Sequence, residues 1–332
     1  MAVLYLAECD VEQLLDMPTA IEAVEQAFRQ MAAGKAMNVP RVRAKSPGIV
    51  LHSMSAAAEY LGLVGWKTYT TTQTGAQFLA GLCDAESGDL VALIEADQLG
   101  RLRTGAASAV AAAYMADMAA AEMGLFGTGR QAKTQLEAIS KARPIKRCYV
   151  YSRMRENRER FAAEMTATFG IEVAPVDRPQ GAAEDLPIVV TATTSAAPVF
   201  DGNDLSEGAL VCAIGSNWPH RAEIDVHTIR RADNVVCDSC DACRREAGDF
   251  REAIEKGVFD WSRAVDLADV VAGRAVGRNN RQSVALFKSV GLAIEDVALA
   301  AVLVERARAR GAGRWIMVGP TAQSDSRPHE AS

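Results

Sequence analysis

The chain lacks the features that mark several large classes of protein. Its 36 Lys and Arg are outnumbered by 42 Asp and Glu, so a net charge of -6 offers no electrostatic basis for binding nucleic acid or an anionic membrane. No apolar run approaches the roughly 18 residues that a membrane span needs. The first residues, MAVLYLAECD, include acids but no basic segment before an apolar core. We therefore expect no signal peptide and, by default, a cytoplasmic protein.

A disulfide framework and a hydrolase triad are also missing. The seven cysteines are odd in number and scattered, which is typical of reduced thiols. Cys237, Cys240 and Cys243 form C-x-x-C-x-x-C, but no fourth Cys or His lies nearby to complete a tetrahedral site. We therefore favour free thiols over a metal or iron–sulfur centre and expect no metal. A G-x-S-x-G elbow is absent, and the chain has four histidines.

The most informative motif present is a G-x-G-x-x-A turn. A short apolar run stops at this turn, and an amphipathic segment follows it directly; the turn comprises Gly127, Thr128, Gly129, Arg130, Gln131 and Ala132. The first glycine allows a tight strand-to-helix turn, the second allows close approach of a pyrophosphate, and the small third residue allows helix–sheet packing. Free N–H groups at the helix N-terminus would face the phosphates. Alone, the motif also fits a glycine turn in another kind of α/β protein.

The hydrophobic pattern predicts two regions of different texture. The 332 residues, 49% of them hydrophobic, are enough for two domains. A helix is expected over 11–34, short antiparallel or mixed strands between 38 and 96, and an Ala-rich helix over 103–120. Helices then alternate with strands near 148–152, 171–176, 188–194, 209–217 and 234–239, which predicts a parallel sheet with helical crossovers. From about 283 the pattern indicates one long helix, over 292–310, and the polar residues 321–332 are expected to be a disordered tail.

Cationic side chains are concentrated in the first region. Lys67 lies inside the apolar run LVGWKTYT, where it is expected to point into a cleft, although an exposed lysine on an edge strand is the alternative. Arg103 begins the Ala-rich helix and is suited to hold a carboxylate, or else is an ordinary surface arginine. Arg41 lies upstream, and His52 is either structural or functional. A nucleotide turn with a basic pocket favours hydride transfer on an anionic substrate.

These motifs, in this order, resemble the ornithine cyclodeaminase/mu-crystallin family from about residue 3 to 318. The matching segments are VPRV at 39–42, LHSMSA at 51–56, VGWKTYT at 64–70, LRTGAASAVAAAYMA at 102–116, GTGRQAKTQLEA at 127–138, AIGSNWPHRAEID at 213–225 and LFKSVGLAIEDVALA at 286–300. The resemblance implies an α/β fold with a Rossmann-type doubly wound parallel sheet over 119–294. It also implies a second α+β domain for substrate binding and dimerisation, from residues 1–118 with 295–320. A homodimer and a nicotinamide cofactor are implied as well.

The resemblance also implies roles for individual residues. Arg41, Lys67 and Arg103 match the cationic substrate-binding residues, with Arg103 matching the carboxylate anchor. Thr104, Ser289 and Gly291 match residues that line the cofactor. Thr193, Thr194 and Gly215 follow predicted strand ends, where α/β proteins place ligands. His52 occupies a position that varies in the family between acidic and basic residues, so Lys67 and His52 are the candidates for donating a proton.

Two positions bear on the reaction and on the cofactor. The catalytic aspartate of ornithine cyclodeaminases corresponds to Asn217, and an amide cannot act as a carboxylate base, although it can hydrogen-bond a ribose or a substrate. After the second strand of the nucleotide fold, where NAD selection usually places an acid, the chain has Ser152 and Arg153. Ser152 and Arg153 can accept a 2′-phosphate, so we favour NADP while NAD remains possible.

The sequence therefore predicts an NAD(P)H-dependent oxidoreductase that acts on a small imino or keto acid. It would reduce an α-imino acid, or reductively aminate an α-keto acid, to an L-amino acid. The several cations suit a dicarboxylic substrate such as iminosuccinate. Two alternatives stay open. One is a cyclodeaminase with tightly bound NAD, which Asn217 disfavours. The other is a non-catalytic, crystallin-like protein that binds NADP and a small ligand, which the intact cationic set disfavours.

Overall fold

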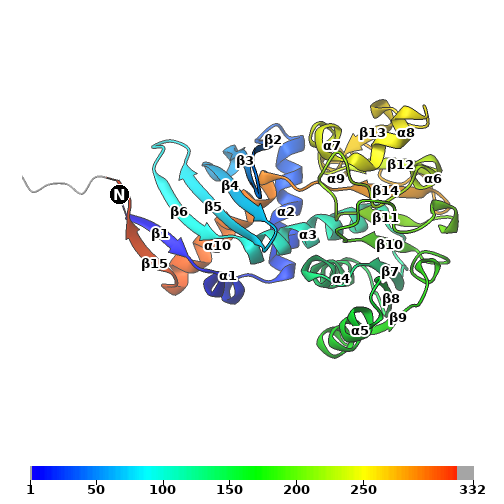
Figure 1. The fold of residues 1–332 in the computed structure, drawn as a ribbon. Coiled ribbons are helices and arrows are strands. Elements are labelled where there is room, and N and C mark those ends of the chain that lie inside the picture. The colour runs from blue at the N-terminus through cyan, green and yellow to red at the C-terminus, as the bar shows by residue number, and fades with distance from the viewer. Residues whose placement is uncertain (1, 320–332) are drawn as a thin grey trace, which may run out of the picture.

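The computed structural model describes residues 2–319, and the polar tail expected over 321–332 lies outside them. Two β-sheets lie side by side, each with its own helices (Figure 1). The strands are β1 (Ala2–Leu6), β2 (Ala36–Ser46), β3 (Ile49–Ala58), β4 (Leu63–Thr72), β5 (Ala76–Asp84), β6 (Leu90–Glu95), β7 (Glu122–Phe126), β8 (Arg147–Tyr151), β9 (Glu172–Pro175), β10 (Ile188–Thr191), β11 (Leu210–Ala213), β12 (Ala232–Cys237), β13 (Ala264–Asp266), β14 (Val284–Lys288) and β15 (Arg314–Met317).

The helices connect and cover these strands. They are α1 (Glu8–Leu14), α2 (Met17–Ala32), α3 (Asp97–Met115), α4 (Arg130–Ala142), α5 (Arg155–Phe169), α6 (Val226–Arg231), α7 (Cys240–Glu246), α8 (Arg251–Glu255), α9 (Leu267–Val271) and α10 (Ala293–Arg310). Across residues 2–319, none of these helices has the length and apolar character to cross a bilayer.

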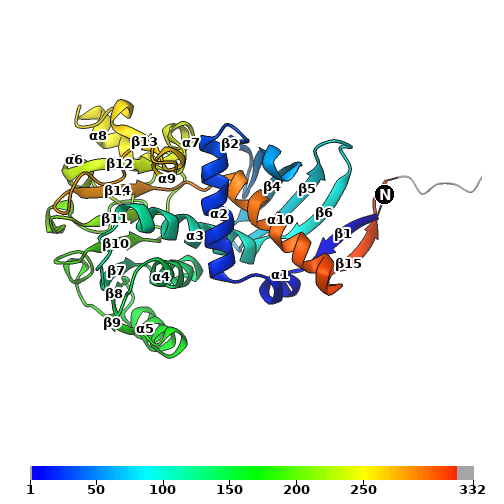
Figure 2. The ribbon, with the colours of Figure 1, turned by 180° about the vertical axis from the view of Figure 1, so that it is seen from behind.

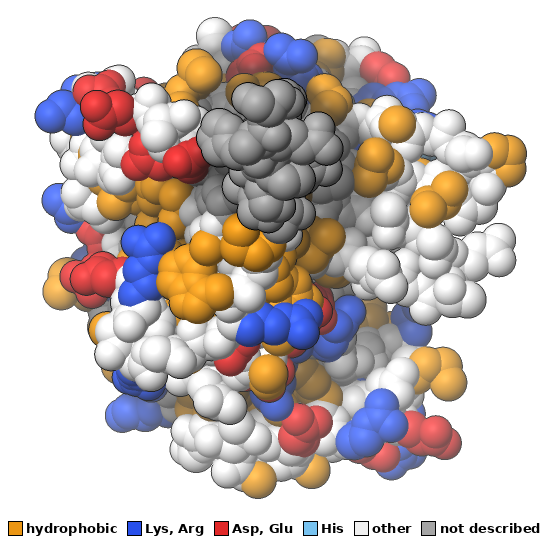
Figure 3. Space-filling model, turned by 90° about the vertical axis from the view of Figure 1, so that its left-hand side faces the viewer, with side chains coloured by type: hydrophobic (Ala, Val, Ile, Leu, Met, Phe, Trp, Pro, Cys, Tyr) orange, Lys and Arg blue, Asp and Glu red, His pale blue; other side chains and the backbone are white. Residues whose placement is uncertain are grey.

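Within the described chain, the first sheet has seven strands in the order β15-β1-β6-β5-β4-β3-β2. Its pairs are antiparallel except β1 with β6, and the turn between β5 and β6 is the hairpin expected at ESGD. Helices α2 and α10 cross one face of this sheet (Figure 2). No helix of residues 2–319 covers the opposite face of this sheet (Figure 1). The end of the molecule formed by β1, β15 and β6 also exposes hydrophobic side chains, among scattered charges (Figure 3).

The second sheet is parallel throughout the described residues, in the order β13-β12-β14-β11-β10-β7-β8-β9. The strand order reverses between β7 and β10, because the chain runs outward from β7 to β9 before it returns. Ligands of doubly wound sheets bind at the carboxyl ends of the strands beside such a reversal. The G-x-G-x-x-A turn follows β7 and therefore lies there. The predicted α/β fold with a parallel sheet is confirmed.

Three local predictions were wrong. The helix expected over 11–34 is two helices, because Asp16 caps α2 by accepting from the Thr19 amide and Pro18 follows. Strand β14 was missed because its five residues are all buried and show no alternation, so the segment was absorbed into the following helix. Helix α3 begins at Asp97, which places Arg103 in its second turn rather than at its start.

Candidate active site

The turn after β7 leaves an open cradle at the N-terminus of α4. Gly127 has a φ of 109°, and a Cβ there would lie 2.4 Å from the Ala192 carbonyl oxygen, so only glycine fits. Gly129 is the N-cap of α4 with no side-chain cap, and a Cβ on it would meet nothing within 4 Å. The first amides of α4 therefore face open space, which fits a pyrophosphate. Ala132 is fully buried beneath them.

Two hollows meet at this turn, and nearly all of the predicted site residues line one or both of them. A cavity of about 480 Å³ lies between the sheets; the predicted residues that line it are Arg41, His52, Lys67, Arg103, Thr104, Gly129, Arg130, Gln131, Thr193, Thr194, Gly215, Asn217, Ser289 and Gly291. A second hollow of about 300 Å³ is lined by Gly127, Thr128, Gly129, Ser152, Arg153, Thr193 and Thr194. Ala132 lines neither, as expected for a residue that packs the helix on the sheet. The shared residues make the two hollows one trough along the turn.

The smaller hollow ends at Ser152 and Arg153, after β8. The Ser152 hydroxyl donates to the Met154 carbonyl at 3.1 Å, and Arg153 is exposed. No Asp or Glu is among the described residues that line this hollow. This end of the hollow therefore carries an arginine and, among the described residues, no acid.

One wall of the larger cavity is a row of side chains across four strands of the first sheet. Arg43 on β2 is paired in register with His52 on β3, His52 with Tyr69 on β4, and Tyr69 with Phe78 on β5. His52 and Tyr69 stack with ring centroids 4.2 Å apart, and Tyr69 and Phe78 with centroids 5.0 Å apart. Trp218, from the loop after β11, meets His52 edge-on and lies 4.4 Å from the Arg43 guanidinium carbon. The wall is therefore flat and aromatic.

His52 is held neutral within this wall. Arg43 Nε donates to its Nδ1 at 3.2 Å, so the ring proton is on Nε2, which lies 3.1 Å from Thr71 Oγ1. Burial first, and then the positive charges of Arg43 and Arg41, lower the pKa of His52 to about 4. Both ring nitrogens are thus engaged, which favours Lys67 over His52 as a proton donor.

Lys67 and Arg103 share a pair of acids at the start of α10. Lys67 Nζ donates to Asp296 Oδ1 at 2.8 Å, and Arg103 Nε donates to the same oxygen at 3.2 Å. Arg103 Nη1 donates to Glu295 Oε2 at 2.9 Å, while Nη2 has no partner among the described residues. Burial lowers the pKa of Lys67, although Asp296 opposes the shift. The pKa of Arg103 is raised because Asp296 and Glu295 outweigh its burial.

Gly100 makes room for this lysine. A Cβ at Gly100 would lie 2.3 Å from Lys67 Nζ, so α3 passes the ammonium group at a glycine. That glycine also weakened the helix pattern before Arg103, which explains why the start of α3 was misplaced.

Arg41 and Arg43 share one carboxylate from the other sheet. Both donate to Glu246 Oε2, at the end of α7, and the Arg43 bond is 2.6 Å long. Arg41 Nη2 also donates to the Val290 carbonyl at 2.9 Å, which leaves Arg41 Nε buried without a partner among the described residues. Arg41, Lys67 and Arg103 therefore all line the cavity, and Glu246 balances one of the two positive charges of Arg41 and Arg43.

Two further acids, missed in the sequence, hold the loops of the cavity. Asp238 Oδ2 accepts from Ser289 Oγ at 2.8 Å and from the Val290 and Gly291 amides at 2.7 Å. Glu223 accepts from the Thr193 hydroxyl and amide at 2.7 Å and from the Gly215 amide at 2.6 Å. The Ser289 and Thr193 hydroxyls are thus committed to these acids. The signal that was available is an acid inside a predicted buried segment.

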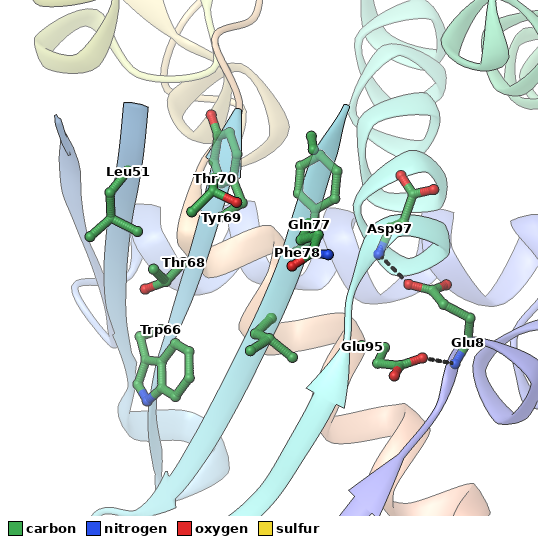
Figure 4. A pocket seen from close by; sticks show the side chains of 12 residues that line it. Glu8, Leu51, Trp66, Thr68, Tyr69, Thr70, Gln77, Phe78, Glu95 and Asp97 are labelled. Carbon is green, nitrogen blue, oxygen red and sulfur yellow. Dashed lines mark hydrogen bonds between the residues drawn. The ribbon is translucent and has the colours of Figure 1, made fainter. Parts of the chain in front are cut away.

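A larger hollow, of about 770 Å³, lies on the uncovered face of the first sheet (Figure 4). Its lining includes Leu51, Trp66 and Leu79, and its charged residues, Glu8, Glu95 and Asp97, are all acidic. Glu8 and Glu95 are occupied with backbone amides, since the Glu8 amide donates to Glu95 at 2.9 Å and the Asp97 amide to Glu8 at 2.6 Å. Without a cation, this hollow does not suit an anionic substrate.

The C-x-x-C-x-x-C cysteines lie at the end of β12 and the start of α7. All are free; Cys237 and Cys243 are buried, and Cys240 is half-buried. Cys243 Sγ lies 3.5 Å from Asp238 Oδ1. No group of three or more His, Cys, Asp or Glu in residues 2–319 is arranged to hold a metal ion.

A dinucleotide turn at the strand reversal, opening onto a buried cationic pocket between two sheets, defines an oxidoreductase that uses a nicotinamide dinucleotide. The model of the ornithine cyclodeaminase/mu-crystallin family matches residues 2–311, and the chain belongs to that family. It is 32% identical to the Delta(1)-pyrroline-2-carboxylate reductase of Bacillus cereus over 94% of this chain and 99% of the relative.

Solved structures agree with this assignment. Delta(1)-pyrroline-2-carboxylate reductase of Thermococcus litoralis, in complex with NADH and L-proline, is 33% identical with a TM-score of 0.90, covering 94% of this chain and 99% of the other. An archaeal alanine dehydrogenase, a dimer with bound NAD, is 30% identical with a TM-score of 0.90, covering 96% and 99%. These relatives are reductases or dehydrogenases that act on imine or amine groups.

Proposed function

We propose that the protein reduces a small α-imino acid with one carboxylate to the L-amino acid, with a cyclic imine such as Δ1-pyrroline-2-carboxylate as the preferred substrate. The observation that carries this proposal is the cluster of three cations that line the cavity, Arg41, Lys67 and Arg103, beside the flat aromatic wall of His52 and Tyr69. One end of such a cavity suits a carboxylate and the other suits a ring. The proposed residue roles follow from this arrangement.

Arg103 would hold the carboxylate through Nη2, which has no partner among the described residues, and Arg41, which also lines the cavity, would add its positive charge. Lys67 Nζ would donate the proton that the imine nitrogen takes up on becoming an amine. The nicotinamide supplies the hydride to the imine carbon when the cofactor is bound. Buried Asp296 orients Lys67 by accepting from its ammonium group.

The two parts of the chain would have different roles in this reaction. Residues 1–118 with 295–320 would bind substrate, and 119–294 would bind the cofactor. A dicarboxylic substrate such as iminosuccinate is the second candidate, favoured by the presence of Arg43 and of Lys45 near Trp218 at 5.5 Å. Glu246 weighs against it, because Arg41 and Arg43 already share that carboxylate.

The test is a set of initial rates of NADH and NADPH oxidation. The substrates are Δ1-pyrroline-2-carboxylate, pyruvate with ammonia, pyruvate with methylamine, and oxaloacetate with ammonia. We expect the cyclic imine to have the highest kcat/KM, by at least about tenfold, or about 1.4 kcal/mol. Faster turnover of oxaloacetate with ammonia would establish the dicarboxylate instead. Proline formation from L-ornithine with NAD would contradict both, since Asn217 replaces the required acid.

We also propose that NADP is preferred to NAD. The support is the exposed Arg153 beside Ser152 and the lack of an acid among the described residues of the smaller hollow. Arg153 can pair with a 2′-phosphate, whereas nothing there accepts both ribose hydroxyls. A higher kcat/KM for NADH than for NADPH would overturn this choice.

We propose, finally, that two copies associate through the uncovered face of the first sheet. Leu51, Val64 and Leu79 are about 40% exposed on that face, and an apolar sheet face of this kind is typical of an interface. Leu79→Glu should convert a dimer to a monomer in size-exclusion chromatography with light scattering. Met118→Glu, at an exposed methionine between α3 and β7, is the matched control. A monomeric wild type would refute the proposal.

A further inference from the structure

The two acids at the start of α10 differ in how their charges are balanced. Asp296 Oδ1 accepts from two cations, Lys67 and Arg103, while its Oδ2 is buried with no partner among the described residues. Glu295 accepts one bond, from Arg103 Nη1, and its Oε1 is buried with no partner among the described residues. Glu295 is fully buried. A buried carboxylate with one bare oxygen is costly when charged and much less so when it carries a proton.

The charges around Glu295 come from four elements. Arg103 on α3 favours its charged form. Asp296 on α10 and Asp238, after β12, disfavour it, and Lys67 on β4 joins the cluster through Asp296. Asp238 is fully satisfied as an anion, because it accepts from Ser289 and two backbone amides. Glu295 therefore has fewer donors than Asp238 to balance a negative charge.

One effect opposes this assignment. Glu295 lies in the first turn of α10, where the helix dipole favours an anion. However, no backbone amide of the described residues donates to its carboxyl group, so the helix stabilises a charge on Glu295 through its dipole alone. Burial, together with Asp238 and Asp296, outweighs both the dipole and Arg103, and raises the pKa of Glu295 to about 8.

We infer that Glu295 is a neutral carboxylic acid in the working enzyme, and that its neutrality leaves a net positive charge on the cluster of Lys67, Arg103, Glu295 and Asp296 to attract the substrate carboxylate. With Glu295 neutral, Lys67 and Arg103 face the single charge of Asp296, so one positive charge remains. With Glu295 ionised, this cluster is neutral and the attraction for a carboxylate is weaker, because only Arg41 and Arg43, which share Glu246, keep a net positive charge. Glu295 is thus a positioning residue: when it is neutral, it holds Arg103 by a hydrogen bond without balancing the positive charge that attracts the substrate. This inference rests on the proposed function for its kinetic consequence alone.

The kinetic test compares wild type with Glu295→Gln, which copies the shape of the protonated acid. Above about pH 8 the wild-type KM should rise by up to tenfold per pH unit as Glu295 ionises. The KM of Glu295→Gln should stay flat over the same range, with kcat/KM within about threefold of wild type at pH 7. Parallel KM profiles, or a loss of more than about 30-fold at pH 7, would overturn the inference.

A spectroscopic test does not depend on the substrate. Difference infrared spectroscopy at pH 7 should show the C=O stretch of a protonated carboxyl group in wild type and not in Glu295→Gln. The band should disappear as the pH is raised past about 8. Glu246→Gln is the matched control, because it removes a buried carboxyl group outside this cluster, which accepts from two arginines, and it should leave the band in place. A protonated band that survives in Glu295→Gln refutes the inference. A lost band with no activity on any imine refutes the proposed function instead.

Discussion

Replacing Lys67 with methionine tests the proposed proton donor most directly. Methionine has a similar length without the charge, and Asp296 keeps its hydrogen bond from Arg103 Nε at 3.2 Å, so no buried carboxylate is left unpaired. Removal of a general acid costs about 100- to 10,000-fold in kcat, or about 3–5 kcal/mol. Because a buried charge is also removed, thermal stability should be unchanged or higher.

The assay measures kcat from NAD(P)H oxidation with the best imine, together with cofactor affinity from NAD(P)H fluorescence. Wild-type kcat should fall as pH rises, because Lys67 must be protonated to donate. Its lowered pKa places that fall below the ordinary lysine range. Lys67→Met should lose this dependence and keep its cofactor affinity. Lys35→Met, at an exposed lysine, is the control. A kcat of Lys67→Met within about threefold of wild type would refute the assignment.

Four further outcomes are expected. Gly129→Val should abolish NAD(P)H binding in fluorescence titrations, because its side chain would fill the cradle at α4; unchanged binding would place the cofactor elsewhere. Arg153→Asp should shift the ratio of kcat/KM values from NADPH toward NADH, and an unchanged ratio would exclude Arg153 from selection. Wild type and Cys240→Ser should both contain no stoichiometric zinc or iron by elemental analysis; metal lost on substitution would contradict free thiols. Because the pKa of His52 is lowered to about 4, its protonation opposes folding, so stability should fall as pH drops from 6.5 toward 4. That fall in melting temperature should be smaller in His52→Gln, and equal falls would show that His52 is not the cause.

Local sequence was enough to predict most of the parallel sheet and the turn that follows β7. The turn over Gly127 to Ala132 is contiguous, and its glycines act through backbone geometry, so its place after a strand and before a helix could be predicted. The same holds for Lys67, whose apolar neighbours indicated a buried strand. The family resemblance implied substrate-binding roles for Arg41 and Arg103, and both line the same cavity as Lys67. Strand β14 escaped because a strand buried on both faces has no alternation to detect.

The charge balance of the pocket was decided by the tertiary structure alone. Glu246 lies 205 residues from Arg41, and Asp296 lies 229 residues from Lys67, so no local pattern links them. In the sequence, Arg41, Lys67 and Arg103 suggested a dicarboxylate. Folding brings Glu246 and Asp296 against these cations and leaves fewer free donors. The tertiary structure also decided the role of His52, because Arg43 and Thr71 form hydrogen bonds with its two ring nitrogens. Residue type determined which groups were available, but the protonation and pairing of each depend on neighbours that only the packed sheets bring together.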